Sequence, residues 1–304
     1  MKFNIYQEVT DRIIKQLENG IIPWRKPWRM AGVTIKGAND LRKVAFNRVT
    51  KTAYSALNQM LLTRAGEYAT FKQWQDLGGK VKKGAKAEIV VFWKWIDTVT
   101  KADDQSEGEE EKLISIPYLR YYQVFHIDDV DGVKPLTFDE INEPTEFDPE
   151  EQAEKVMNTF SEREKIEIRY GGNSAFYSPT LDFIQLPQRF QFGEKAGEFY
   201  STAFHEIVHS TGSWKRLGRL EDDHHFGGEK YSKEELVAEI GAAGMLNLLN
   251  LETESTFKNS VAYIRSWGEV LKNDNKMIIQ ASSKAEKAVR YILIGKQENF
   301  EGAV

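Results

Sequence analysis

The 304-residue sequence predicts a soluble α+β protein of two units. Hydrophobic residues make up 41% of the chain, which is enough for sizeable cores, yet no run of about 18 apolar residues indicates a membrane span. Helical and strand patterns are mixed in the second half of the chain. The length exceeds that of a typical single domain, so two units are the expectation.

The cytoplasm is the expected compartment. The chain contains no cysteine, which excludes disulfides and thiolate metal sites and favours a reducing environment. The N-terminal stretch MKFNIYQEVTDRIIKQ contains acidic residues and lacks the apolar segment and cleavage site of a signal peptide.

Charge divides the chain into two different halves. Residues 1–100 contain 18 Lys and Arg against 8 Asp and Glu, a net charge of +10. The remaining residues contain 23 basic and 38 acidic side chains, a net charge of −15. Such an imbalance points to different partners for the two halves.

Periodicity and breakers predict the elements of each half. A stretch rich in Gly, Pro and acidic residues at 128–149 is the expected linker between units at 1–127 and 150–304. An acidic stretch at 101–112 is expected to be a hairpin excursion rather than a boundary. In the first unit we expect helices over 3–18, about 54–64 and 70–77, an extended segment over 22–29, and strands over 87–96 and 113–125. In the second we expect helices over 149–161, 194–212 and 232–250, a strand over 166–170, and two short strands within 176–186.

The motif H-E-x-x-H lies within one of the predicted helices. Residues four apart share a helical face, so His205 and His209 can bind one Zn²⁺. Glu206 would then lie beside the open coordination position and activate a bound water, whose pKa zinc lowers towards about 7. Two histidines at this spacing also occur in helices without metal, but the mostly apolar helix ending at Gly212 favours a catalytic zinc site. Another divalent metal such as Mn²⁺ is the alternative.

A catalytic zinc takes three protein ligands, so a third must be found. The metzincin extension of the motif fails because Lys215 stands where its histidine would be. Downstream, the segment 232–239 offers acids one turn apart. We predict Glu235 as the third ligand and Glu239 as the acceptor for a ligating imidazole.

Other assignments stay open. Ser232 and Glu235 fit an S-x-x-E capping box, in which Glu235 would only satisfy the start of a helix. Glu239 could itself be the ligand, and so could three residues of the preceding loop, Asp222, His224 and His225.

The strand expected over 181–186 directly precedes the metal helix. In zinc peptidases such a strand can pair its edge with an extended peptide substrate. An ordinary core strand is an equally good interpretation.

Binding of single-stranded nucleic acid needs cations along the backbone and flat side chains on which bases stack. The first hundred residues offer both, although Trp24 and Trp28 could instead lie in a small core. The candidate contact residues are Trp24, Arg25, Lys26, Trp28, Arg29, Arg48, Lys51, Lys72, Lys80, Lys82 and Lys83.

Both halves contain strings that are typical of one family. The first half has TDRII at 10–14, LENG at 17–20, PWRKPW at 23–28, TFKQ at 70–73 and LGGKVKKG at 77–84. The second half has YSP at 177–179, IQLP at 184–187, HEIVHSTG at 205–212, RL at 216–217 and EELVAE at 234–239. Over nearly its whole length the chain resembles the ArdC antirestriction proteins. It departs from their pattern near 54–58, where a usual glycine is replaced, and in the acidic insertion at 101–112.

The resemblance implies an N-terminal α/β domain that binds single-stranded DNA, followed by a zincin-like metallopeptidase domain. It implies a protein of mobile elements that protects incoming DNA from host restriction. Three functions then compete: a zinc peptidase that cleaves a DNA-bound host protein, a non-proteolytic protein that shields single strands and holds a structural zinc, and a metal-dependent nuclease. The nuclease is the weakest, because H-E-x-x-H suits one zinc and one water rather than a carboxylate-rich two-metal site.

Overall fold

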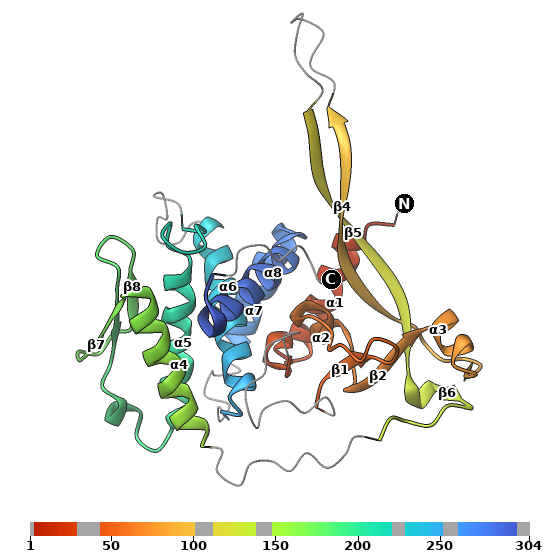
Figure 1. Cartoon of the computed structure of the whole chain (residues 1–304), viewed down its shortest axis with the longest axis horizontal. Helices are drawn as coiled ribbons and strands as arrows, with labels where there is room; N and C mark the ends of the chain where they lie inside the picture. The colour runs from red at the N-terminus through yellow and green to blue at the C-terminus, as the bar shows by residue number, and fades with distance from the viewer. Residues whose placement is uncertain are drawn as a thin grey trace, which may run out of the picture.

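A computed structural model describes residues 3–28, 43–100, 112–137, 148–220, 229–251 and 261–296. The fold is a mixture of helices and sheets, as the sequence predicts, with a sheet-rich N-terminal part beside a helix-rich C-terminal part (Figure 1). None of the described helices is long and apolar enough to cross a membrane.

The N-terminal part is a mixed four-stranded sheet with helices on it. The sheet order is β1-β2-β5-β4, with β1 and β2 parallel and the other pairs antiparallel. Thr70 caps α3 through a capping box with Gln73, and the helix ends before Gly78, as predicted. The elements are α1 (Ile5–Glu18), β1 (Ala45–Asn47), α2 (Ala56–Leu61), β2 (Gly66–Thr70), α3 (Phe71–Asp76), β3 (Lys80–Val81), β4 (Glu88–Thr100), β5 (Lys112–His126) and β6 (Val130–Asp131).

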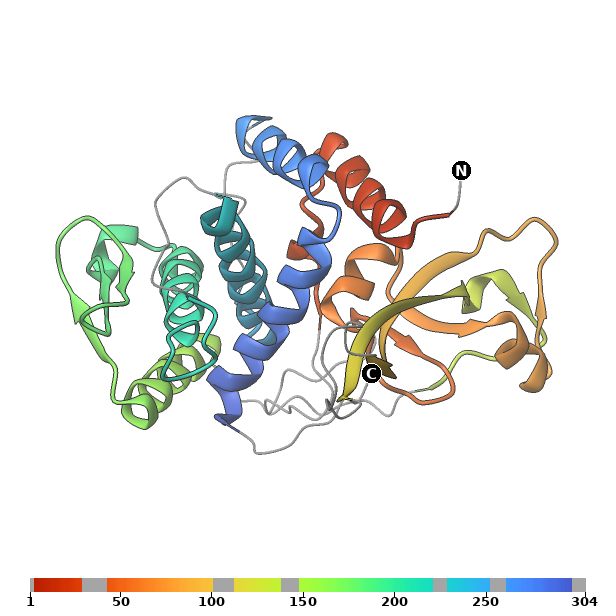
Figure 2. The same cartoon turned by 90° about the horizontal axis from the view of Figure 1, so that it is seen from above.

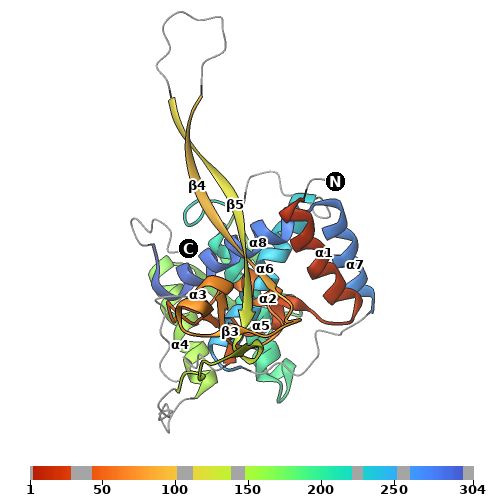
Figure 3. The same ribbon diagram turned by 90° about the vertical axis from the view of Figure 1, so that its right-hand side faces the viewer.

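The long β4–β5 hairpin extends well beyond this sheet. The register of the hairpin runs from Glu88 opposite Val124 to Thr100 opposite Lys112. Strand β2 pairs only with the last three residues of β5. The outer part of the hairpin, here called the β4–β5 arm, therefore projects from the body of the molecule (Figures 1 and 3).

The C-terminal part packs helices against one another and against a small three-stranded sheet. The sheet order is β7-β9-β8, with β9 in the centre. Helix α5 lies against this sheet on one side and against α6 on the other (Figures 1 and 2). The elements are α4 (Pro149–Glu164), β7 (Glu167–Tyr170), β8 (Phe176–Ser178), β9 (Phe183–Leu186), α5 (Ala196–Thr211), α6 (Glu229–Leu248), α7 (Val261–Asn273) and α8 (Met277–Ile294).

One hydrophobic core joins the two parts. Apolar side chains of α1 and α2 belong to the same buried cluster as those of α5, α6 and α8. Trp28 is buried against α6, where an added Cβ at Gly244 would overlap its ring. The hydroxyl of Thr10 donates to the carbonyl of Asn275 at 2.9 Å. The two parts are therefore packed as one body (Figure 2).

Three local expectations differ from the structure. The segment 22–29 is not wholly extended, because Pro23–Arg25 forms a short 3-10 helix in which proline takes the first position, where no N–H is needed. The helix expected from Ser232 begins at Glu229 instead, so Ser232 lies inside α6. Helix α2 is also shorter than the predicted 54–64, since Ser55 caps its start.

Candidate metal centre

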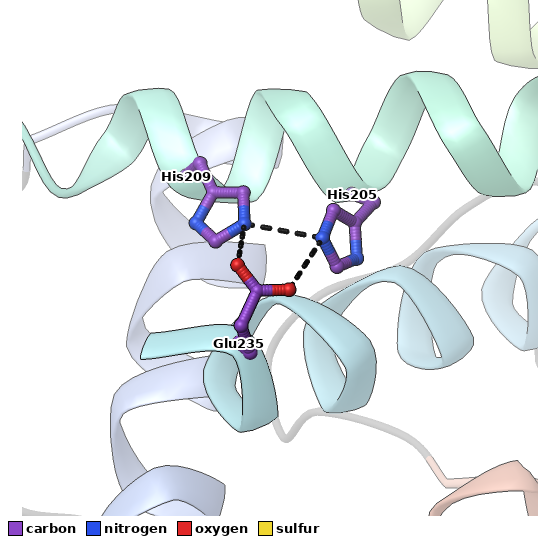
Figure 4. A group of neighbouring side chains, drawn as sticks. All are labelled: His205, His209 and Glu235. Carbon is purple, nitrogen blue, oxygen red and sulfur yellow. Dashed lines mark hydrogen bonds and ion pairs between the residues drawn. The ribbon is translucent and has the colours of Figure 1, made fainter. Parts of the chain in front are cut away.

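The two histidines of the H-E-x-x-H motif point at the same position. Helix α5 places His205 and His209 one turn apart, and their Nε2 atoms lie 3.1 Å from each other (Figure 4). Both side chains are largely buried, at 18% and 14% exposed. The predicted pairing of these two imidazoles is present in the structure.

Glu235 of α6 completes a group of three possible ligands. Its carboxylate oxygens lie 3.5 Å from Nε2 of His205 and 3.3 Å from Nε2 of His209. The three ligand atoms lie within 4.8 Å of one another (Figure 4). Because α6 begins three residues before Ser232, Glu235 does not cap this helix. The capping-box interpretation of Glu235 was therefore wrong.

Close packing of two helices brings Glu235 to the histidines. At Gly241 of α6, an added Cβ would meet the side chain of Val208 at 2.8 Å, closer than side chains approach. The glycine lets α6 lie directly on the buried face of α5. This approach depends on tertiary packing, which is why spacing in the sequence alone could not fix the third ligand.

A neighbouring carboxylate, to which the sequence assigned no role, lies against His209. Oε1 of Glu234 lies 3.4 Å from Nδ1 of His209. Arg219 holds Glu234 through contacts of 2.8 and 3.2 Å, and its guanidinium also donates to the carbonyl of Val208. Burial alone would raise the pKa of Glu234, but the hydrogen bonds from His209 and Arg219 lower it overall.

Glu239, to which we assigned this supporting role, lies one turn beyond Glu235 on α6 and is half-buried. It does not belong to the converging group of three. In the structure it is Glu234 that contacts His209, so the assignment of Glu239 to that imidazole is corrected. The remaining alternatives, Asp222, His224 and His225, lie outside the described residues.

Glu206 sits beside this group and is 8% exposed. Burial raises the pKa of Glu206, while the nearby histidines and a hydrogen bond with the backbone of Tyr177 act in the opposite direction. Tyr177 belongs to β8, so this strand lies next to the acid.

The strand beside Glu206 is an edge strand, but it is not the one expected. Residues 181–186 were a possible peptide-binding edge by sequence, whereas β9 is paired on both sides. The free edge nearest the candidate centre belongs to β8. Of the two interpretations of 181–186, the structure supports the ordinary core strand, and the peptide-binding edge was wrong because strand order is a tertiary property.

A buried ionic cluster ties this sheet to α5. Asp182, which adopts a left-handed backbone with φ of 53°, accepts from Tyr177 at 2.9 Å and from Arg216 at 2.8 Å. Arg216 also donates to the carbonyl of Ser210 at the end of α5, at 3.1 Å. Hydrogen bonds from Arg216 and Lys215 lower the pKa of Asp182 against the opposing effect of burial. The cluster fixes β8 and β9 relative to the helix with the histidines.

The residues nominated for nucleic-acid binding differ in how far they are exposed to solvent. Trp24 and Trp28 are each 1% exposed in the shared core, so they cannot stack on bases and their nomination was wrong. Lys26 is half-buried, and burial lowers its pKa. Arg25 is also half-buried, Arg48 pairs with Glu67, and Arg29 lies outside the described residues. The exposed cations are Lys51, Lys72, Lys80, Lys82 and Lys83.

Comparison with known proteins matches one family to each end of the chain. Residues 3–125 match the N-terminal domain of the anti-restriction factor ArdC, and residues 152–284 match a zincin-like metallopeptidase family. An uncharacterized protein of Sinorhizobium fredii, y4eC, is 33% identical over 93% of this chain and 90% of its own length. A DNA primase TraC of Escherichia coli is 31% identical over 99% of this chain, which spans only 28% of the primase.

Solved structures extend the similarity to the fold. The Mn(II)-bound crystal structure of the antirestriction protein ArdC from the R388 plasmid is 31% identical, with a TM-score of 0.67 over 95% of this chain and 97% of that one. Its metal-free structure is 33% identical, with a TM-score of 0.66 over 97% and 100% of the two chains. The chain therefore belongs to the ArdC family of antirestriction proteins, with an N-terminal ArdC-type domain followed by a zincin-like domain.

Proposed function

We propose that the protein is a metal-dependent peptidase that binds single-stranded DNA and acts in antirestriction. One observation carries the peptidase part. His205, His209 and Glu235 converge from two helices, and a fourth polar side chain, Glu206, stands beside them. Three ligands leave a coordination position open, whereas structural zinc sites usually use four. This arrangement favours a catalytic over a structural metal.

The donor set fits zinc, with manganese as the alternative. Two imidazoles and one carboxylate are typical ligands of catalytic zinc, and the related ArdC structure contains Mn(II). His205, His209 and Glu235 would hold the ion. Once bound, the ion would act as a Lewis acid that polarises a substrate carbonyl and lowers the pKa of water.

The protein's own side chains supply the proton transfers of peptide hydrolysis. Glu206 would accept a proton from the attacking water, and would deliver it to the departing amine when the C–N bond breaks. Glu234 would keep the His209 ring in one orientation through its Nδ1 atom. The free edge of β8, next to Glu206, is the place where an extended peptide could add as a further strand.

The DNA-binding part rests on charge and on the family. The first hundred residues carry a net charge of +10, and five lysines from this region are exposed. Such a surface attracts the phosphate backbone of nucleic acids. A host protein that is bound to incoming DNA would then be the substrate, and the cytoplasm would be the place where the two meet.

The test compares restriction of incoming DNA in cells that carry the wild-type protein or its Glu206→Gln variant. The variant should keep its metal content and its DNA binding, but should lose protection of the DNA and cleavage of restriction proteins. Glu198→Gln, on the first turn of the same helix, is the matched control and should protect like the wild type. Full protection by Glu206→Gln would instead support a protein that only shields DNA.

A further inference from the structure

The β5 strand exposes three tyrosines within five residues. Tyr118, Tyr121 and Tyr122 are 53%, 43% and 45% exposed. No other stretch of five among the described residues exposes three large aromatic side chains. Exposed aromatic groups gathered in this way are typical of binding surfaces.

Alternation along the strand divides this aromatic cluster between two faces. Leu119 and Tyr121 face the body of the protein, since Leu119 is buried in the main core and Tyr121 packs on Phe3 with ring centroids 5.0 Å apart. Tyr118, Arg120 and Tyr122 share the opposite face, here called the β5 outer face. The strand register places this face next to the residues of β5 that pair with β2, where the hairpin leaves the rest of the sheet.

Neighbouring rings hold part of the β5 outer face in place. Tyr122 packs edge-on against Phe92 of β4, with centroids 5.7 Å apart, and Phe92 lies 6.5 Å from the ring of Tyr54. Phe92 is also the register partner of Arg120. A ring held by such contacts loses little conformational freedom when a ligand stacks on it.

The β5 outer face carries an available cation. Arg120 is exposed, and no carboxylate among the described residues pairs with it. Glu88, at the base of the same strand pair, is already engaged, since it accepts from the backbone of Thr63 and the hydroxyl of Tyr68. The face thus combines flat rings with a positive charge that no carboxylate in the described part of the chain neutralises, which complements a ligand made of bases and phosphates.

We infer that Tyr118, Arg120 and Tyr122 form the stacking surface for single-stranded DNA. Bases stack on the two tyrosine rings, which are about 13 Å apart along the strand, and the guanidinium between them contacts the backbone phosphate. This surface takes the role that the sequence suggested for Trp24 and Trp28, which are buried. The inference rests on the proposed DNA binding and specifies where it occurs.

The test measures binding of a fluorescent oligothymidylate to the full chain by anisotropy. The double variant Tyr118→Ala/Tyr122→Ala should bind at least about 10-fold more weakly, because each base stack contributes roughly 1–3 kcal/mol. Tyr118→Phe/Tyr122→Phe should bind like the wild type, since stacking needs the ring and not the hydroxyl. Arg120→Ala should also make the dependence of log Kd on log salt shallower, by about 0.7.

Two exposed residues of the C-terminal part serve as matched controls. Tyr170→Ala removes an exposed tyrosine and Lys155→Ala an exposed cation, and neither should change the affinity. If the wild type binds the oligonucleotide and the double alanine variant binds equally well, the β5 outer face is not the site. Equal weakening by the alanine and phenylalanine pairs would overturn stacking as its basis. If the wild type itself does not bind, the proposed DNA binding fails together with the inference.

Discussion

Oε1 of Glu234 lies 3.4 Å from Nδ1 of His209, on the side of the ring opposite the nitrogen that faces His205 and Glu235. Arg219 fixes the carboxylate in turn. A hydrogen bond to one imidazole nitrogen leaves the other nitrogen as the lone-pair donor and sets the ring orientation. In the proposed metal centre, Glu234 would hold the His209 ring in the orientation that binds the ion.

Loss of this support should weaken metal binding. Glu234→Ala is expected to lower the affinity for Zn²⁺ by about 10- to 100-fold, as changes to such supporting residues usually do. A titration against a competing chelator measures this. Lys233→Ala, at the adjacent position but paired with Asp274, should bind zinc like the wild type. An unchanged affinity in Glu234→Ala would show that the contact does not orient the ligand.

Two variants can distinguish Glu235 from Glu239, one turn away, as the third metal ligand. Glu235→Ala should leave the purified, zinc-loaded protein without stoichiometric metal, because two imidazoles alone hold zinc poorly. Glu239→Ala should retain it, since Glu239 is not in the converging group. Elemental analysis after dialysis distinguishes the two variants, and the reverse pattern would assign the ligand to Glu239.

Gly244 should be needed for the packing of the two parts. Gly244→Ala is expected to destabilise the protein by about 1–3 kcal/mol, because its Cβ would overlap the buried ring of Trp28. Gly268→Ala is the control. This glycine also lies in a helix, α7, but an added Cβ would have open space around it. That change should stabilise the protein by about 0.5–1 kcal/mol through helix propensity. Urea unfolding of both variants gives the comparison, and equal stabilities would contradict the close contact.

Glu286 should make stability depend on pH. Burial raises its pKa to about 7, although its carboxylate accepts from the N–H of Ala56 at the start of α2. A carboxyl whose pKa is raised on folding binds its proton more tightly in the folded state. The stabilisation of the folded state by this tighter proton binding is therefore complete below about pH 4.5 and is lost as the pH rises to about 7.

The glutamine variant removes that titration. Relative to the wild type, Glu286→Gln should gain on the order of 2 kcal/mol of stability between about pH 4.5 and 7, with no further gain above pH 7. Urea unfolding across this range measures the difference. Glu162→Gln, an exposed position on α4, is the control with a small effect. A constant difference between Glu286→Gln and the wild type at every pH would contradict the shift.

Local sequence patterns predicted most of the helices and the centre of the site. His205 and His209 follow from the helical repeat, and Thr70 and Gly78 mark the ends of α3 by their own chemistry. The histidine pair and the ends of α3 depend on residues close in the sequence. Glu235 was also placed in the group, but its approach to the histidines depends on the packing of α6 on α5, which spacing alone could not fix.

The features that the sequence missed depend on packing between distant segments. Composition placed Trp24 and Trp28 with the cations, but only their contact with α6 shows that they are buried. Glu234 and Glu239 are equally plausible neighbours for an imidazole until the rotation of α6 is known. The edge position of β8 likewise requires the order of strands in the sheet.

Because one buried cluster spans both family regions, we expect the chain to unfold as a single cooperative unit. A fragment that ends at residue 126 would leave the rings of Trp24 and Trp28 in water, and should aggregate or unfold. Both halves are also found together in the much longer TraC primase, whose alignment includes 99% of this chain.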